Sequence, residues 1–221
     1  MSPILPDWSR TVELLDRLLD GPLPGPAAQE TMAPRPRPGW TPGGFPDGCR
    51  EAAVLVLVFP RDGAPWFVLT RRTDTLDHHR GQISLPGGAF ENGEDAVACA
   101  LRETEEELGV AVPDARILGL LSPLHVPVSG FRVTPVVAAL AHRPGFDPAH
   151  AEVAAVHETP LAHLLDPARL RWDREHPRAG PSWLDIPWFD LDAQFVWGAT
   201  AMMLAELRAL LEPMAAPERD R

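Results

Sequence analysis

Residues 88–110 read GAFENGEDAVACALRETEEELGV, and this stretch is the most informative part of the chain. It holds seven acidic residues and a single basic one, Arg102. On a helix that turns by about 100° per residue, Glu103, Glu106 and Glu107 fall on one face. The spacing therefore predicts a helix that presents three carboxylates together.

A second face of the same helix is suited to a protein core, because it gathers Val97, Leu101, Thr104 and Leu108. Two interpretations of the acidic face are open at this point. A run of glutamates is usually a solvated surface. Carboxylates that would repel one another are also the ligands that hard divalent cations such as Mg²⁺ prefer.

The spacing of charges and glycines extends over the whole stretch. In order it has Gly88, five residues, Glu94, seven residues, Arg102-Glu103-Thr104, one residue, Glu106-Glu107, one residue and Gly109-Val110. This pattern resembles the box of the Nudix hydrolases, G-x5-E-x7-R-E-U-x-E-E-x-G-U, in which U is a bulky apolar residue. Thr104 departs from it, because an aliphatic residue is usual there.

The resemblance implies an α/β (α+β) Nudix fold, a mixed β-sheet sandwiched between helices. It also implies hydrolysis of a nucleoside diphosphate linked to another moiety, with Mg²⁺ or Mn²⁺ as cofactor. Glu103, Glu106 and Glu107 would then hold the metal, and either Glu106 or Glu103 would be the general base. Arg102 would orient a glutamate through an ion pair.

The preceding segment, residues 69–88, reads LTRRTDTLDHHRGQISLPGG. It resembles the signature of the coenzyme A diphosphatases, L-L-T-x-R-[SA]-x3-R-x3-G-x3-F-P-G-G. The matching positions are Leu69, Thr70, Arg72, Gly81, Pro86, Gly87 and Gly88. The departures are Val68, Thr73, Asp77 and Leu85, of which Asp77 replaces a cation by an anion.

This second resemblance implies that coenzyme A or a CoA ester is the substrate, cleaved to 3′,5′-ADP and 4′-phosphopantetheine or its acyl form. Arg71, Arg72 and Arg80 are candidate phosphate ligands, since the guanidinium fork suits phosphate; otherwise they are solvated loop cations. Gly87 and Gly88 allow the backbone to approach the substrate closely.

Two other functions remain open from the sequence. Because Asp77 departs from the CoA diphosphatase signature, a Nudix enzyme that acts on ADP-ribose or a nucleoside triphosphate is the first alternative. A non-catalytic ligand sensor of Nudix type is disfavoured, because every acidic position of the box is present.

Composition sets further limits. The chain has 221 residues, 45 % of them hydrophobic, and a formal net charge of −11. That charge argues against general binding to nucleic acid or to an anionic membrane. The resemblance implies a small-molecule substrate instead. Cys49 and Cys99 are predicted to be free thiols in a reducing compartment, and we expect a cytoplasmic protein.

Periodicity predicts the remaining elements. Helices are expected at residues 9–19 (with Ser9 as N-cap), 94–108, 161–165 and 196–211, and strands at 52–59, 66–70, 116–121, 131–140, 152–158 and 183–189. Residues 21–48 are rich in Pro and Gly, which predicts an extended arm packed loosely on the domain. We expect an N-terminal helix and arm at 1–48, the hydrolase domain at 49–213 and a tail at 214–221.

Overall fold

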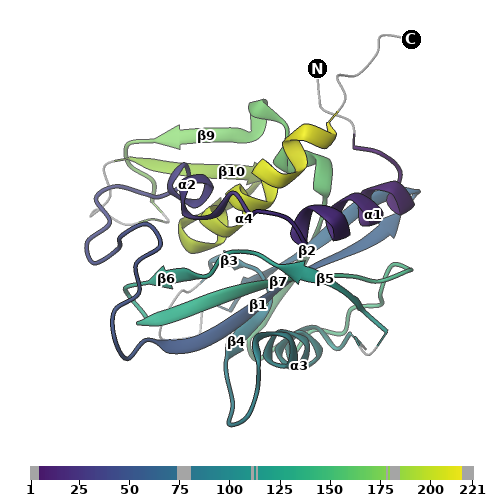
Figure 1. Ribbon diagram of the computed structural model, residues 1–221, viewed down its shortest axis with the longest axis horizontal. Coiled ribbons are helices and arrows are strands. Elements are labelled where there is room, and N and C mark those ends of the chain that lie inside the picture. The colour runs from purple at the N-terminus through teal and green to yellow at the C-terminus, as the bar shows by residue number, and fades with distance from the viewer. Residues whose placement is uncertain are drawn as a thin grey trace.

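The computed structural model describes residues 5–73, 81–110, 112, 114–177, 179 and 185–215. Figure 1 shows a β-sheet with α3 on one face and α1, α2 and α4 on the other. The helices are α1 (Trp8–Leu19), α2 (Gly25–Glu30), α3 (Ala96–Leu108) and α4 (Gly198–Leu211). The predicted mixed sheet between helices is confirmed. No helix in the described ranges combines the length and apolar character needed to cross a bilayer.

Within the described residues the main sheet has eight strands. They are β1 (Arg50–Arg61), β2 (Ala64–Arg72), β3 (Ile83–Ser84), β4 (Gly87–Ala89), β5 (Arg116–Leu120), β6 (Leu124–Val126), β7 (Phe131–Ala139) and β8 (Val153–Pro160). β1 is central and runs parallel to β7, whereas β2 and β4 pair with it antiparallel. Asp62 and Gly63, both at positive φ, make the tight turn from β1 to β2.

The continuous apolar run of β1 is explained by burial on both faces. Leu55, Leu57 and Phe59 join the core cluster beneath α3, while Val56 and Val58 join the larger cluster beneath α1 and α4. Helix α3, the acidic helix predicted from the sequence, is therefore fixed to the sheet by a core cluster separate from the one beneath α1 and α4.

Two predictions for the N-terminal region are wrong. Helix α1 begins at Trp8, and its N-cap is Asp7, whose carboxylate accepts a 3.0 Å hydrogen bond from the Arg10 N–H; Ser9 lies inside the helix. The Pro/Gly-rich segment also contains helix α2, with Pro26 in its first turn, where the missing N–H costs nothing. Met32 directly after it is 2 % exposed, so this segment packs into the core rather than lying loosely on it.

Helix α2 is held by a buried carboxylate. Glu206 of α4 is fully buried and accepts hydrogen bonds from the Gly25 N–H (3.1 Å), the Gln29 side-chain amide (3.0 Å) and the Ser122 N–H (3.1 and 3.2 Å). A buried carboxylate is tolerated when its lone pairs are satisfied in this way. Glu206 thus joins α2, α4 and the loop after β5, and Figure 1 shows α2 beside α4.

The C-terminal region contains strands that the periodicity analysis missed. β9 (Leu170–Asp173), β10 (Ile186–Leu191) and β11 (Gln194–Trp197) form a separate antiparallel sheet. β10 confirms the second half of the strand predicted at 183–189, whereas residues 183 and 184 lie outside the described residues. The closing helix begins at Gly198, because Val196 and Trp197 belong to β11. The short helix predicted at 161–165 is a 3₁₀ helix, Leu161–Leu164, and two further 3₁₀ turns occupy Pro167–Arg169 and Glu212–Met214.

Candidate active site

Helix α3 is fixed at both ends by side-chain and backbone caps. The Asp95 carboxylate accepts a 2.9 Å hydrogen bond from the Ala98 N–H, and Gly109 ends the helix in the left-handed conformation at φ 62°. Thr104 is fully buried and donates its hydroxyl to the Ala100 carbonyl at 2.7 Å. The departure from the Nudix pattern at this position is therefore accommodated, because the extra hydroxyl has a partner within the helix.

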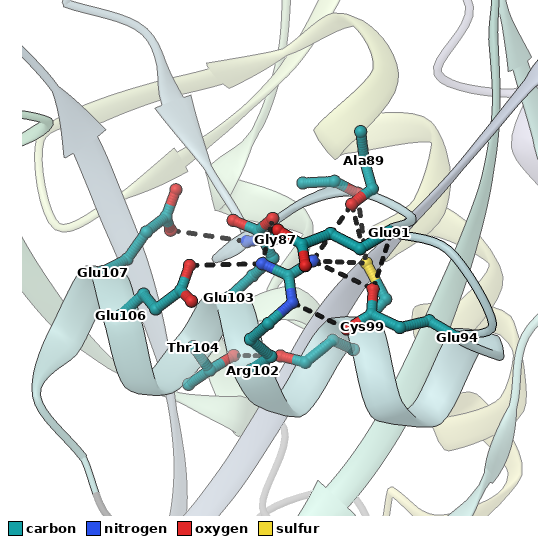
Figure 2. A network of polar contacts seen from close by, with 12 residues as sticks. Gly87, Ala89, Glu91, Glu94, Cys99, Arg102, Glu103, Thr104, Glu106 and Glu107 are labelled. Atoms are coloured by element: carbon teal, nitrogen blue, oxygen red, sulfur yellow. Dashed lines mark hydrogen bonds and ion pairs between the residues drawn. The ribbon is translucent and has the colours of Figure 1, made fainter.

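Arg102 lies at the centre of the acidic cluster, as Figure 2 shows. Its guanidinium donates to both Glu94 oxygens at 2.7 and 3.0 Å, to Glu103 at 2.8 Å and to Glu106 at 3.2 Å. It also donates to the Ala89 carbonyl at 3.1 Å. The hydrogen bond from Arg102 lowers the pKa of Glu94 to about 2. The single base in the stretch therefore fixes the positions of three of its carboxylates.

The glycines before the helix lie against its carboxylates. A Cβ at Gly88 would overlap the carboxylate of Glu103, and a Cβ at Gly87 would overlap the Ala53 carbonyl. Gly87 also has φ 151°, a conformation that residues with side chains rarely adopt. Gly88 thus lets strand β4 approach helix α3, and Gly87 lets it approach strand β1. The substrate contact expected of both glycines stays a prediction.

Cys99 is buried under the same strand. Its thiol points at the Gly88 and Ala89 carbonyls, each 3.4 Å from the sulfur, and burial raises its pKa. Cys49 and Cys99 are both free, as predicted.

Glu107 is the most buried of the three predicted ligands, with 5 % of its surface exposed. It accepts a long 3.4 Å hydrogen bond from the Gly87 N–H, and an Arg72 nitrogen lies 3.8 Å from its other oxygen. Burial is the main cause that raises the pKa of Glu107 to about 7; the charges of Glu103 and Glu152 act in the same direction, while Arg72 and the Gly87 N–H oppose them. A carboxylate in such a position is poised to accept a cation.

Glu152 is a neighbour of Glu107 that the sequence interpretation did not assign to the site. It lies just before β8, is exposed, and its carbonyl accepts a 2.9 Å hydrogen bond from the Thr73 N–H. Its charge reaches Glu107, about 45 positions away in the chain, because the segment before β8 lies against the end of α3, where the Ala149 N–H donates to the Glu107 carbonyl at 2.9 Å. No local spacing signal could have identified it.

The donor set fits a hard divalent cation in its chemistry, because Glu103, Glu106 and Glu107 offer carboxylate oxygens from one face of α3 (Figure 2). As placed, however, no three His, Cys, Asp or Glu side chains within the described ranges are close enough to hold an ion together. Arg102 stands between Glu103 and Glu106, and Glu107 turns towards Gly87 and Arg72. Arg102 and Arg72 therefore offset the negative charge of the three glutamates, a role that bound metal ions could also fill.

The three candidate phosphate ligands are not gathered at one place. Arg72 lies near Glu107, whereas Arg71 follows the opposite face of β2. Arg80 and the unusual Asp77 lie outside the described residues. The structure thus brings one arginine of the signature segment, Arg72, to the carboxylates.

The Glu105→Gln variant should retain nearly full activity. Glu105 is exposed and points roughly 160° away from Glu107 around the helix. Its side chain therefore cannot share a ligand position with the acidic face. Steady-state kinetics of the folded variant test this, and a large loss of activity would contradict the orientation of α3 on which the site is built.

Comparisons with known proteins agree with this geometry. The NUDIX domain family matches residues 50–180. An uncharacterized Nudix hydrolase, NudL, from Yersinia enterocolitica is 35 % identical over 167 residues, which cover 75 % of this chain and 84 % of the relative. The protein of the same name from Escherichia coli is 38 % identical over 166 residues, covering 72 % and 81 %.

Among solved structures, the fold is similar to that of RenU, a Nudix hydrolase from M. smegmatis. The TM-score is 0.51 at 20 % identity, covering 77 % of this chain and 91 % of the other. At that identity the likeness concerns the fold alone. The family match, the relatives and the complete acidic pattern on α3 lead to one conclusion: the chain belongs to the Nudix hydrolases and acts on a pyrophosphate bond.

Proposed function

We propose that this enzyme is a Mg²⁺- or Mn²⁺-dependent hydrolase of coenzyme A or CoA esters. The products are 3′,5′-ADP and 4′-phosphopantetheine or its acyl form. The observation that supports this substrate most directly is the position of Arg72. It belongs to the segment that resembles the CoA diphosphatase signature, and its guanidinium lies 3.8 Å from Glu107 of the Nudix helix. One arginine of that segment therefore lies beside a carboxylate of the Nudix helix, which supports the proposal.

Glu103, Glu106 and Glu107 are the residues that would hold the metal. A divalent ion bound there supplies charge neutralisation for the diphosphate and lowers the pKa of water. Glu106 is 60 % exposed at its side chain, whereas Glu103 is enclosed by Arg102 and Gly88. We therefore assign to Glu106 the acceptance of a proton from the attacking water, with Glu103 as the alternative base.

Two arginines, Arg102 and Arg72, have the positioning and substrate-binding roles at this site. Arg102 orients Glu94, Glu103 and Glu106 through direct hydrogen bonds and is a positioning residue. Arg72 offers its guanidinium beside Glu107, where it can contact the diphosphate. Gly88 has no side chain and so leaves room for the Glu103 carboxylate, and Gly87 has none and so leaves room for strand β1.

The proposal also covers the binding partner, the cellular compartment and the domain arrangement. The partner is a small molecule rather than nucleic acid or an anionic membrane, since the net charge of −11 would repel these two large anionic surfaces. Two free thiols suit a reducing cytoplasm. For the domain arrangement, we propose residues 49–213 as the hydrolase domain, preceded by the segment that contains α1 and α2.

A substrate panel tests the proposed function. CoA, ADP-ribose and nucleoside triphosphates are incubated with the full chain in Mg²⁺, in Mn²⁺ and in excess chelator, and products are separated by chromatography. We expect CoA to have the highest kcat/KM, to yield 3′,5′-ADP, and to remain intact in chelator. Faster cleavage of ADP-ribose would assign the enzyme to that substrate instead. Binding without turnover in either metal would make the protein a ligand sensor.

A further inference from the structure

Two adjacent arginines at the end of β2 lie on opposite faces of the sheet. Residues alternate along a strand, and the core confirms the phase: Val68 joins the cluster beneath α3, and Leu69 the cluster beneath α4. Arg72 follows Val68 and Thr70 and reaches Glu107 on the α3 face. Arg71 follows Leu69 onto the other face. One of the two arginines is thus separated from the carboxylates by the strand itself.

Arg71 has a histidine beside it on that second face. β8 pairs antiparallel with β2, so that His157 lies opposite Leu69 and Ala155 lies opposite Arg71. His157 and Arg71 are therefore diagonal neighbours on one face, within reach of long side chains. Arg71 contributes to the lowered pKa of His157, after burial, which confirms that the two groups are close.

The histidine has an unused hydrogen-bonding atom. His157 Nε2 is buried and has no hydrogen-bond partner in the described part of the chain. A buried polar atom without a partner costs free energy, which a bound polar group would recover. Asp192, whose charge also acts on His157, has its carboxylate 3.1 Å from His163 and 3.7 Å from Arg169.

We propose that Arg71 and His157 form a second anion subsite, which binds a phosphate of the substrate other than the diphosphate at Arg72. This inference rests on the proposed function, because CoA carries a 3′-phosphomonoester in addition to its diphosphate. β2 ends at Arg72, so both arginines lie within one residue of the end of the strand. Arg71 is then the residue that distinguishes CoA from dephospho-CoA, and Arg72 serves both.

The test compares kcat/KM for CoA and for dephospho-CoA in four proteins: wild type, Arg71→Ala, Arg72→Ala and the control Arg171→Ala. Arg171 is an exposed arginine of β9 with no part in either site. We expect wild type to prefer CoA by on the order of ten- to a hundredfold, the range for a charge-assisted arginine–phosphate contact. Arg71→Ala should remove this preference by slowing CoA alone. Arg72→Ala should slow both substrates, and the control should slow neither.

Two further measurements separate binding from folding. Arg71→Lys keeps the charge and should restore part of the preference, which a merely misfolded variant would not do. In wild type, 3′,5′-ADP should inhibit more strongly than AMP, and Arg71→Ala should make the two inhibitors equal.

The outcomes also separate this inference from the function on which it rests. Equal kcat/KM for CoA and dephospho-CoA in wild type would leave the CoA hydrolase in place and remove the second subsite. So would an Arg71→Ala variant that slows both substrates alike. If wild type cleaves neither molecule but cleaves ADP-ribose, the proposed function fails and the inference fails with it.

Discussion

In the Glu107→Gln variant we expect kcat to fall by at least about 100-fold while the fold remains intact, because a neutral amide binds a hard cation poorly. Glu106→Gln should show a loss of the same order for the same reason. The two residues differ in surroundings, since Glu107 is nearly buried and Glu106 is largely exposed. A similar fall in kcat in both variants would therefore indicate that both carboxylates bind the metal, rather than that both support the packing of the protein. CoA turnover at saturating substrate measures the effect.

Measurements of thermal unfolding distinguish a loss of catalysis in these variants from a loss of folding stability. Without metal, Glu107→Gln should have a Tm no lower than that of wild type, because an uncharged side chain avoids the cost of burying a carboxylate. Added Mg²⁺ should raise the Tm of wild type more than that of the variant. Glu105→Gln is the matched control on the same helix. Near wild-type turnover in Glu106→Gln or Glu107→Gln would overturn the assignment of the metal ligands.

Adding a single methyl group at Gly88 should be nearly as damaging. In Gly88→Ala the new Cβ would overlap the Glu103 carboxylate, so the carboxylate or strand β4 must move. A displacement of about 1 Å at a catalytic constellation can lower the rate by about 100-fold, and we expect kcat/KM to fall by that order. The backbone of Gly88 does not adopt a positive φ, so the substitution tests the steric overlap alone.

Gly145→Ala is the control for this experiment. Gly145 is exposed, has no positive φ, and nothing lies within 4 Å of a Cβ placed there. That variant should retain full activity and Tm. Unchanged kcat/KM in Gly88→Ala would show that Glu103 can shift freely, and hence that its position beside β4 is unimportant for the reaction.

The acidic helix could be predicted in detail because its determinants are local. The positions of Glu103, Glu106 and Glu107 follow from helical periodicity, and the end of the helix follows from Gly109. The opposite orientations of Arg71 and Arg72 follow equally from strand alternation, although the sequence interpretation grouped them as one cluster.

Other features depend on contacts that no local pattern contains. Helix α2 is six residues long and lies in a Pro/Gly-rich segment, where propensity argues against it; Glu206 and the core hold it instead. Glu152 enters the site because the segment before β8 is hydrogen-bonded to the end of α3. The start of α4 was misplaced because β11 and α4 are both apolar and follow each other directly, the strand ending at Trp197 and the helix beginning at Gly198.

The buried carboxylate of Glu206 has a consequence for the order in which the chain folds. Its partners Gly25, Gln29 and Ser122 are 181, 177 and 84 residues away along the chain. Contacts between such distant residues close large loops, whose entropy must be overcome before the contacts form. A helix as short as α2 has little stability of its own. The N-terminal segment should therefore dock last, after the sheet and α4 have assembled, and its amides should be among the first to open and exchange in the folded protein.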